Sequence, residues 1–351
     1  MIGDPAISTS DEAITAVVTL VLNDLCFGET QALRVHVDGA REMVMARGGL
    51  AALGGQHDLA KMVLVADLAT AIAVDTSPSF SEAELAAYTQ SLTAPLASTP
   101  NGTTNPPNPA PLSNIALPHT PNLNPATTAM LNDTTFLIDT ALNLPPNPPH
   151  AQLQKVLAMS NWVQGRLSAA AATTTTTTTT TINPTINPNI TATPTTNMTA
   201  KRNPSAALHR AVRLSSQLYC RAIQTRQPLA SVARPQDALD LVEAVRAVQG
   251  GIWDGTCRSG GGGMLRTLVS VLVVVLPVML GGDFNLEMGS GSGGLRYGDG
   301  DGYGYGYGYG GRGLVVAAVV RLAMVDWPGA VRVLGRVVRL QAWLRGAVGG
   351  G

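Results

Sequence analysis

The chain is 351 residues long, only 4% of its residues are aromatic, and its formal net charge is +0. With so few aromatic side chains, the core must be built from leucine, valine, alanine and methionine, which favours packing between helices over an aromatic-rich sheet sandwich. The three cysteines, Cys26, Cys220 and Cys257, are far apart and form no CxxC pair. A disulfide framework and a cysteine-based zinc site therefore have no support.

Charge is distributed unevenly along the chain. Residues 1–95 carry a net charge of −8, and residues 205–351 carry a net charge of +6. Such asymmetry indicates either a charged partner or a contact between the two halves of the chain. We favour the contact between the halves.

Three helices are predicted within residues 1–95. The sequence TSDE at residues 9–12 has the form of a capping box, with Thr9 as the N-cap of the first helix. Gly48 and Gly49 supply the C-terminal stop of the second helix, and the third is expected over residues 57–75. The apolar stripe that predicts burial of the second helix consists of Leu33, Val37, Ala40 and Val44.

The composition changes in the middle of the chain. Residues 96–150 are rich in proline and asparagine, and repeated proline forbids a regular helix, so we expect a mostly mobile linker. Residues 134–144 are the part of it that is able to dock against the fold. A helix is predicted over residues 151–170. Residues 171–204 contain a run of nine threonines and offer almost nothing to bury, so we expect this segment to be disordered.

Helical periodicity returns in residues 205–351. Helices are predicted over residues 205–226 and 236–249. The apolar segment at residues 264–280 predicts a buried core helix, because a membrane span needs about 20 apolar residues.

A low-complexity insertion rich in glycine and tyrosine occupies residues 289–313. The chain closes with two helices broken around Asp326, Trp327 and Pro328, and Pro328 suits the first turn of the last helix. Arg332, Arg336 and Arg339 recur on one side of that helix. We interpret them as a solvated face, since a basic stripe without a recognised module is weak evidence for nucleic-acid binding.

No motif predicts catalysis. A GxGxxG string occurs at Gly289, Gly291 and Gly294, but no predicted strand precedes it and no predicted helix follows it. P-loop, HExxH and GxSxG patterns are absent, and the five histidines at positions 36, 57, 119, 150 and 209 include no pair at i, i+4 spacing. We therefore assign no catalytic, cofactor-binding or metal-binding residue, and expect no enzyme and no cofactor.

In the segment at residues 35–54, several charged residues lie close in sequence to the double glycine. Phosphate cradles place glycines at the beginning of a helix, where backbone N–H groups point outward. Here the glycines follow a helix, where carbonyl groups point outward and the dipole disfavours anions. The segment is therefore interpreted as a helix end.

The same segment resembles a signature of the fungal-specific transcription factor domain family. Ala66-Asp67-Leu68 is similar to a step that follows the signature in that family, and Trp327 and Trp343 are similar to tryptophans near its end. The matching signature positions are His36, Gly39, Met43, Val44, Arg47, Gly48, Gly49, Leu50, Leu53 and Gly54.

The resemblance implies an all-α, multi-helix regulatory domain of a nuclear transcription regulator, interrupted here by low-complexity disordered insertions. Residues 1–95 and 205–351 would form its N-terminal and C-terminal helical parts. The family's usual DNA reader is a six-cysteine zinc cluster, which three scattered cysteines cannot form, so we do not expect direct DNA binding by this chain. The implied partners are proteins of the transcription machinery or a DNA-binding partner. No membrane is expected, and homodimer formation stays open.

A helical scaffold or interaction protein without a role in transcription is the alternative. It would contain the same kinds of helices and lack the same catalytic motifs. Localisation separates the two, because a scaffold need not enter the nucleus.

Overall fold

The computed structural model describes residues 9–27, 30–53, 57–93, 123–145, 148–176, 204–252, 269–270, 273 and 311–348. All regular secondary structure within these residues is helical, which confirms the predicted all-α fold class. The elements in chain order are α2 (Asp11–Phe27), α3 (Thr30–Ala46), the 3₁₀ helix η1 (Leu50–Ala52), α4 (His57–Ala73), α5 (Glu82–Thr93), α6 (Pro125–Leu142), α7 (His150–Thr176), α8 (Pro204–Thr225), α9 (Leu229–Val232), α10 (Pro235–Ile252), α13 (Gly311–Val325) and α14 (Trp327–Val348).

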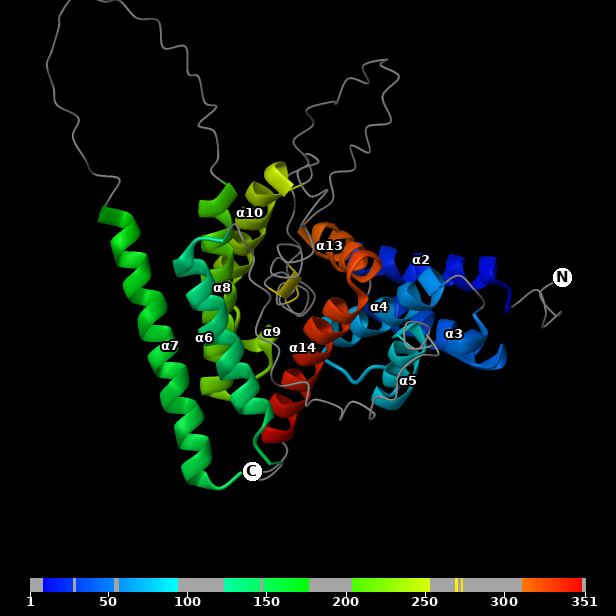
Figure 1. Cartoon of the computed structure of the whole chain (residues 1–351), viewed down its shortest axis with the longest axis horizontal. Coiled ribbons are helices and arrows are strands. Elements are labelled where there is room, and N and C mark those ends of the chain that lie inside the picture. Colours follow the sequence, from blue (N-terminus) through cyan, green and yellow to red (C-terminus); the bar gives the residue numbers. More distant parts are fainter. Residues whose placement is uncertain are drawn as a thin grey trace, which may run out of the picture.

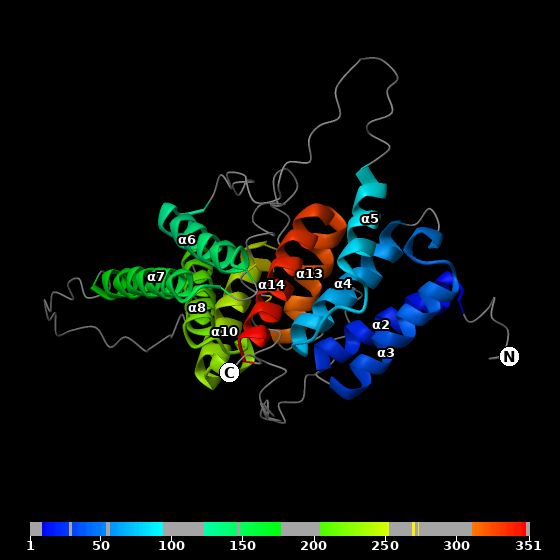
Figure 2. The same ribbon diagram turned by 90° about the horizontal axis from the view of Figure 1, so that it is seen from below.

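The helices form two groups with a pair of helices between them (Figure 1). The first group contains α2 to α5 and the second contains α6 to α10, while α13 and α14 lie between them in both views (Figure 2). Helix α14 contacts both α4 and α6, so it joins the two groups. The N-terminal and C-terminal parts of the chain therefore pack against each other, as we expected from their charges.

Hydrophobic periodicity explains how the first group assembles. Helix α3 buries the stripe predicted from the sequence, which consists of Leu33, Val37, Ala40 and Val44. Helix α4 is different, because every residue from Val63 to Ala73 is buried. A helix that is apolar on all sides needs cover on all sides, and α4 receives it from α2, α3, α13 and α14.

Helix α2 is capped by the residue next to the predicted one. The Ser10 Oγ accepts a hydrogen bond from the backbone N–H of Ala13 at 3.2 Å, so Ser10 is the N-cap. Thr9 instead accepts a hydrogen bond at its backbone carbonyl from Arg47, at 3.2 Å. The prediction of Thr9 is wrong by one position, because two adjacent hydroxyl residues both suit an N-cap.

The prediction of a mobile linker over residues 96–150 is wrong for residues 125–142, which form α6. Its prolines flank the helix rather than interrupt it. Pro125 occupies the first turn, where its missing N–H costs nothing, and the Asn124 side chain accepts a hydrogen bond from the Ala126 N–H at 2.9 Å. The buried side chains of α6 then pack against α7 and α8.

Helix α7 is longer than the predicted helix at residues 151–170. It ends at Thr176, so the prediction of disorder is wrong for residues 171–176. Four consecutive alanines at residues 169–172 explain the extension, because alanine has the highest helix propensity. The helix therefore continues into the threonine run.

Several predictions fall on residues that the structure does not describe. They include the predictions for residues 96–122 and 146–147 of the linker, for residues 177–203 of the threonine-rich segment, and for the insertion up to residue 310. Helix α13 begins at Gly311, so the insertion prediction is wrong for residues 311–313. Of the predicted core helix at residues 264–280, only residues 269, 270 and 273 are described, and Val269 and Val273 are buried.

The break between α13 and α14 lies where it was predicted. The Asp326 side chain caps α14 by accepting a hydrogen bond from the Gly329 N–H at 3.1 Å, and Pro328 lies in the first turn. Trp327 then packs edge-on against Tyr88 of α5, with 5.7 Å between the ring centroids. The break therefore places a tryptophan at the contact between α14 and the first group.

Candidate functional site

The segment at residues 36–53, which carries most of the family resemblance, folds as a helix, a tight turn and a short 3₁₀ helix. The N–H groups of Gly48 and Gly49 donate to the carbonyls of Met45 and Val44, at 3.0 and 2.9 Å. This pair of bonds forms a Schellman motif, which favours glycine at the position with positive φ. The φ angles are 105° at Gly48 and 89° at Gly49. The double glycine therefore ends α3, as predicted.

Two polar side chains of this segment fasten it to α2. Arg47 forms an ion pair with Asp11 and a hydrogen bond with the Thr9 carbonyl. The His36 Nδ1 lies 2.7 Å from the Asp24 Oδ2. Because Arg47 is engaged within the fold and follows a helix end whose carbonyls point outward, the segment does not present an anion cradle.

The Ala66-Asp67-Leu68 step lies in the buried helix α4. Asp67 is 3% exposed, and its two carboxylate oxygens accept hydrogen bonds from the backbone N–H groups of Ser79 and Phe80, at 2.8 and 3.0 Å. Burial raises the pKa of the Asp67 carboxyl, although these hydrogen bonds and the nearby Arg41 oppose the rise. Asp67 therefore holds the chain between α4 and α5 against α4.

No contact in the described part of the chain explains why position 39 is a glycine. A Cβ atom added at this position would meet nothing within 4 Å, and packing within the described part of the chain does not require a glycine there. Gly54, the last signature position, lies outside the described residues.

The three arginines of α14 do not form the single solvated face that we predicted. Of the three, only Arg339 is exposed. Arg336 contacts Asp139 of α6 through two pairs of atoms, Nε to Oδ1 at 2.9 Å and Nη2 to Oδ2 at 3.2 Å. The prediction is wrong for Arg336, because helical spacing identifies a shared side of a helix without revealing what packs on that side.

The histidines show no sign of metal binding in the described part of the chain, where no three His, Cys, Asp or Glu side chains gather in a suitable arrangement. The His209 Nδ1 lies 2.8 Å from the Thr127 Oγ1. Burial lowers the pKa of His209, and the positive charge of Arg213 lowers it further. His119 is among the residues that the structure does not describe.

Among the described helices, none combines the length and the apolar character needed to cross a membrane.

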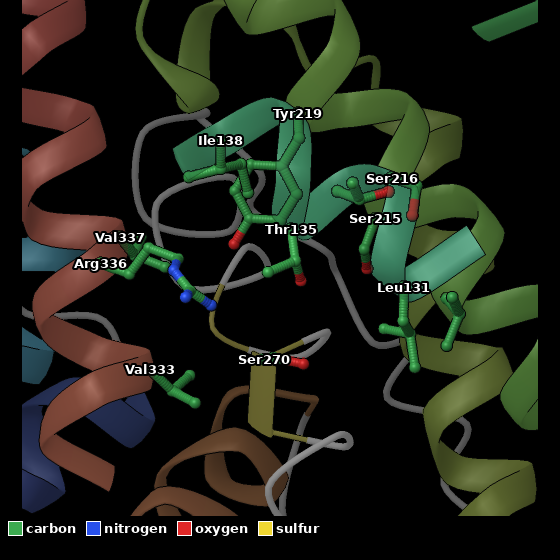
Figure 3. Close-up of a pocket in the computed structure, with 12 residues that line it drawn as sticks. Leu131, Thr135, Ile138, Ser215, Ser216, Tyr219, Ser270, Val333, Arg336 and Val337 are labelled. Atoms are coloured by element: carbon green, nitrogen blue, oxygen red, sulfur yellow. The ribbon is translucent and has the colours of Figure 1, made fainter. Parts of the chain in front are cut away.

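A cavity opens between α6, α8 and α14 (Figure 3). Its volume is about 40 Å³, taken as the space open to the centre of a water molecule. A single water needs about 10–15 Å³ in this measure, so the cavity has room for about three waters or for a ligand of similar size. Apolar side chains make up much of its wall, together with the hydroxyl groups of Thr135, Ser216 and Tyr219 and the guanidinium of Arg336.

The polar groups of this cavity come from α6, α8 and α14 and from Ser270. Tyr219 of α8 is only 4% exposed, and its hydroxyl and the Arg336 guanidinium point toward each other (Figure 3). Burial raises the pKa of Tyr219, and Arg336 only partly opposes the rise, so Tyr219 is protonated at neutral pH. Within the part of the chain that the structure describes, the hydroxyls of Thr135, Ser216 and Tyr219 form no hydrogen bond.

Sequence reasoning did not identify this cavity. Thr135 lies in the segment predicted to be a linker, and Arg336 was assigned to a solvated face. The sequence does contain one indication of a polar site at Tyr219. A tyrosine on the apolar side of a predicted helix carries a hydroxyl group that needs a hydrogen-bond partner.

The described cysteines are expected to react slowly with alkylating reagents. Burial raises the pKa of the Cys26 and Cys220 thiols to about 11. At pH 8 roughly one such thiol in a thousand is ionised, whereas a free cysteine with a pKa of about 8.5 is ionised to roughly a quarter. Iodoacetamide should therefore label both sites on the order of 100-fold more slowly than free cysteine, as measured by peptide mass mapping. Labelling of the folded protein at the rate seen in denaturant would contradict this expectation.

No protein family, curated protein or solved structure matches this chain. The resemblance to the fungal-specific transcription factor domain therefore stays a prediction, based on the signature residues.

Proposed function

We propose that this chain is the helical regulatory domain of a nuclear transcription regulator, and that it acts through contacts with proteins of the transcription machinery or with a DNA-binding partner. The observation that carries the proposal is the way in which the residues of the resemblance form one structural unit. His36 and Arg47 attach α3 to α2, and the double glycine ends α3. Asp67 then holds the turn that follows α4. Three polar residues of the resemblance, His36, Arg47 and Asp67, thus hold neighbouring elements together, and these contacts support the proposal.

The surface supports a function based on protein contacts. Phe27 and Val35 in the first group are 73% and 67% exposed, and Trp162 on α7 is 55% exposed. Arg166 lies over the Trp162 ring, 4.8 Å from its centroid. Tryptophan and arginine are enriched among the residues that dominate binding energy in protein interfaces.

The proposal is tested by tethering residues 1–351 to a heterologous DNA-binding module upstream of a reporter gene. We expect reporter output to change severalfold, in either direction. Unchanged output would count against the proposal.

A matched pair of variants shows whether the folded domain causes the change. Val44→Asp puts a charge at a fully buried position of α3, and it should abolish the effect because a buried unpaired charge is strongly destabilising. Met45→Asp changes the neighbouring residue, which is 48% exposed, and should leave the effect intact. Equal effects of the two variants would show that the signature helix does not need to be folded.

The alternative function, a helical scaffold outside transcription, is favoured by the exposed aromatic side chains of α6 and α7. Phe136 is 62% exposed on α6, and Trp162 lies on the adjoining helix. A fluorescently tagged chain distinguishes the two functions. Nuclear accumulation supports the regulator, whereas exclusion from the nucleus supports the scaffold.

A further inference from the structure

We propose that the cavity between α6, α8 and α14 is a binding site for a small carboxylate of two or three carbons. The existence of this site does not depend on the proposed function. Its use as an effector site of the regulatory domain does rest on that function.

The first argument is the presence of hydroxyl groups that line the cavity and form no hydrogen bond within the described part of the chain. Ser216 and Tyr219 are 2% and 4% exposed, and in the described part of the chain their hydroxyls form no hydrogen bond. Buried polar groups are almost always hydrogen-bonded, either to the protein or to an ordered molecule beside them. Both hydroxyls line the cavity together with that of Thr135, so a molecule held there would satisfy them.

The second argument is the sign of the charge that faces the cavity. Arg336 binds Asp139 through Nε and Nη2, which leaves the Nη1 side of the guanidinium for a ligand. Among the described lining residues Arg336 is charged and no acidic side chain is present, since Asp139 lies outside the wall.

The Tyr219 hydroxyl points toward the Arg336 guanidinium (Figure 3). A hydroxyl hydrogen rotates to suit its acceptor, so this group can donate to a ligand oxygen in the cavity. The wall therefore combines the remaining N–H donors of a guanidinium paired with Asp139 and the hydroxyl donors. Carboxylate oxygens are the matching acceptors, because charge-assisted hydrogen bonds are stronger than neutral ones.

The third argument is size. A volume of about 40 Å³ fits a molecule of a few non-hydrogen atoms. Ile138 and Val337 provide apolar wall for a methyl or ethyl group beside the polar end. A bound carboxylate would contact both α14 and the second group of helices, so its binding would strengthen the junction between them.

The test uses the full chain and two probes of nearly identical shape, acetate and acetamide. Binding is measured by saturation-transfer NMR of the probe methyl group at constant ionic strength, with chloride as the competing salt. We expect saturable binding of acetate and at least tenfold weaker binding of acetamide, which lacks the charge. The proposal would be overturned if acetate bound no more strongly than acetamide, or if neither showed saturable binding. The cavity would then hold only water.

Variants show whether binding occurs in this cavity. Tyr219→Phe removes one hydroxyl and keeps the ring, and it should weaken acetate binding at least tenfold, the loss expected for a hydrogen bond to a charged group. Tyr88→Phe is the matched control, because Tyr88 is a buried tyrosine of α5 beside Trp327 and should leave binding unchanged. If Tyr219→Phe does not fold, Thr135→Val tests the same site. Wild-type affinity in a folded variant of Tyr219 or Thr135 would overturn the assignment.

The binding test and the reporter test fail separately. Acetate binding without any reporter effect would reject the proposed function and keep the site. A reporter effect without acetate binding would reject the site and keep the proposed function.

Discussion

Asp67→Asn is expected to lower the free energy of unfolding by about 1–3 kcal/mol at pH 7, because a buried hydrogen-bond donor left without a partner costs about that much. Both oxygens of Asp67 accept a backbone N–H, from Ser79 and from Phe80. Asparagine keeps one acceptor and directs its own N–H₂ group at the second donor, which is then buried without a partner. Urea-induced unfolding of the two proteins measures the difference.

Asp58→Asn is the control, since Asp58 lies on the same helix with its side chain 74% exposed. Surface substitutions of this kind usually change stability by less than about 0.5 kcal/mol. Similar losses in the two variants would show that the hydrogen bonds to Asp67 are not the cause.

The loss caused by Asp67→Asn is also expected to depend on pH. Burial raises the pKa of Asp67 in the folded protein, so the folded state binds the proton more tightly than the unfolded chain does. The resulting stabilisation is fully present below the unfolded pKa of about 3.9 and is lost as the pH rises through the higher folded pKa. Because asparagine does not titrate, the difference between wild type and variant should widen as the pH falls from 7 toward 4. A difference that narrows on acidification would contradict the raised pKa.

Gly49→Ala is expected to lower the free energy of unfolding by about 2 kcal/mol, because strained backbone conformations of this kind cost about 1–3 kcal/mol. Gly49 has φ 89° and ψ −175°, a region that is almost restricted to glycine. Alanine there must either accept the strain or move η1, whose following residue Leu53 is 1% exposed. Thermal unfolding followed by circular dichroism measures the effect.

Gly39→Ala is the matched substitution with the opposite expected sign. Gly39 lies inside α3, and an added Cβ atom would meet nothing within 4 Å. Replacing a glycine in a helix interior with alanine should therefore raise stability by about 0.5–1 kcal/mol. Destabilisation by Gly39→Ala would reveal a packing role for this signature position that the described residues do not show.

The parts of the fold that the sequence predicted are those set by local patterns. The buried stripe of α3 and its glycine stop depend on residues within a few turns of each other, and both are confirmed. The break between α13 and α14 is equally local, because it depends on adjacent residues of one turn. Helix α6 was missed because the prolines around it were treated as a property of the whole segment, although Pro125 begins the helix and the later prolines follow its end.

The cavity was missed for a different reason. Thr135, Tyr219 and Arg336 belong to three helices that are distant in sequence, and only the packing of α14 between the groups brings them together. Helical spacing placed Arg336 on one side of α14 and gave no information about Asp139 on α6. Contacts of this kind depend on the relative positions of helices, which periodicity does not encode.

The central position of α14 has a consequence for synthesis on the ribosome. The Gln341 Nε2 donates a buried hydrogen bond to the carbonyl of Ile72, across 269 positions of the chain. At about 5–20 residues per second, Gln341 is translated on the order of 13–54 s after Ile72. During that interval the apolar residues of α4 are partly exposed to solvent, so α4 can aggregate or bind a chaperone. Contacts between residues that are so far apart in the sequence form slowly, and they therefore also limit the rate of folding. The nascent protein therefore completes its core only when α14 has been translated.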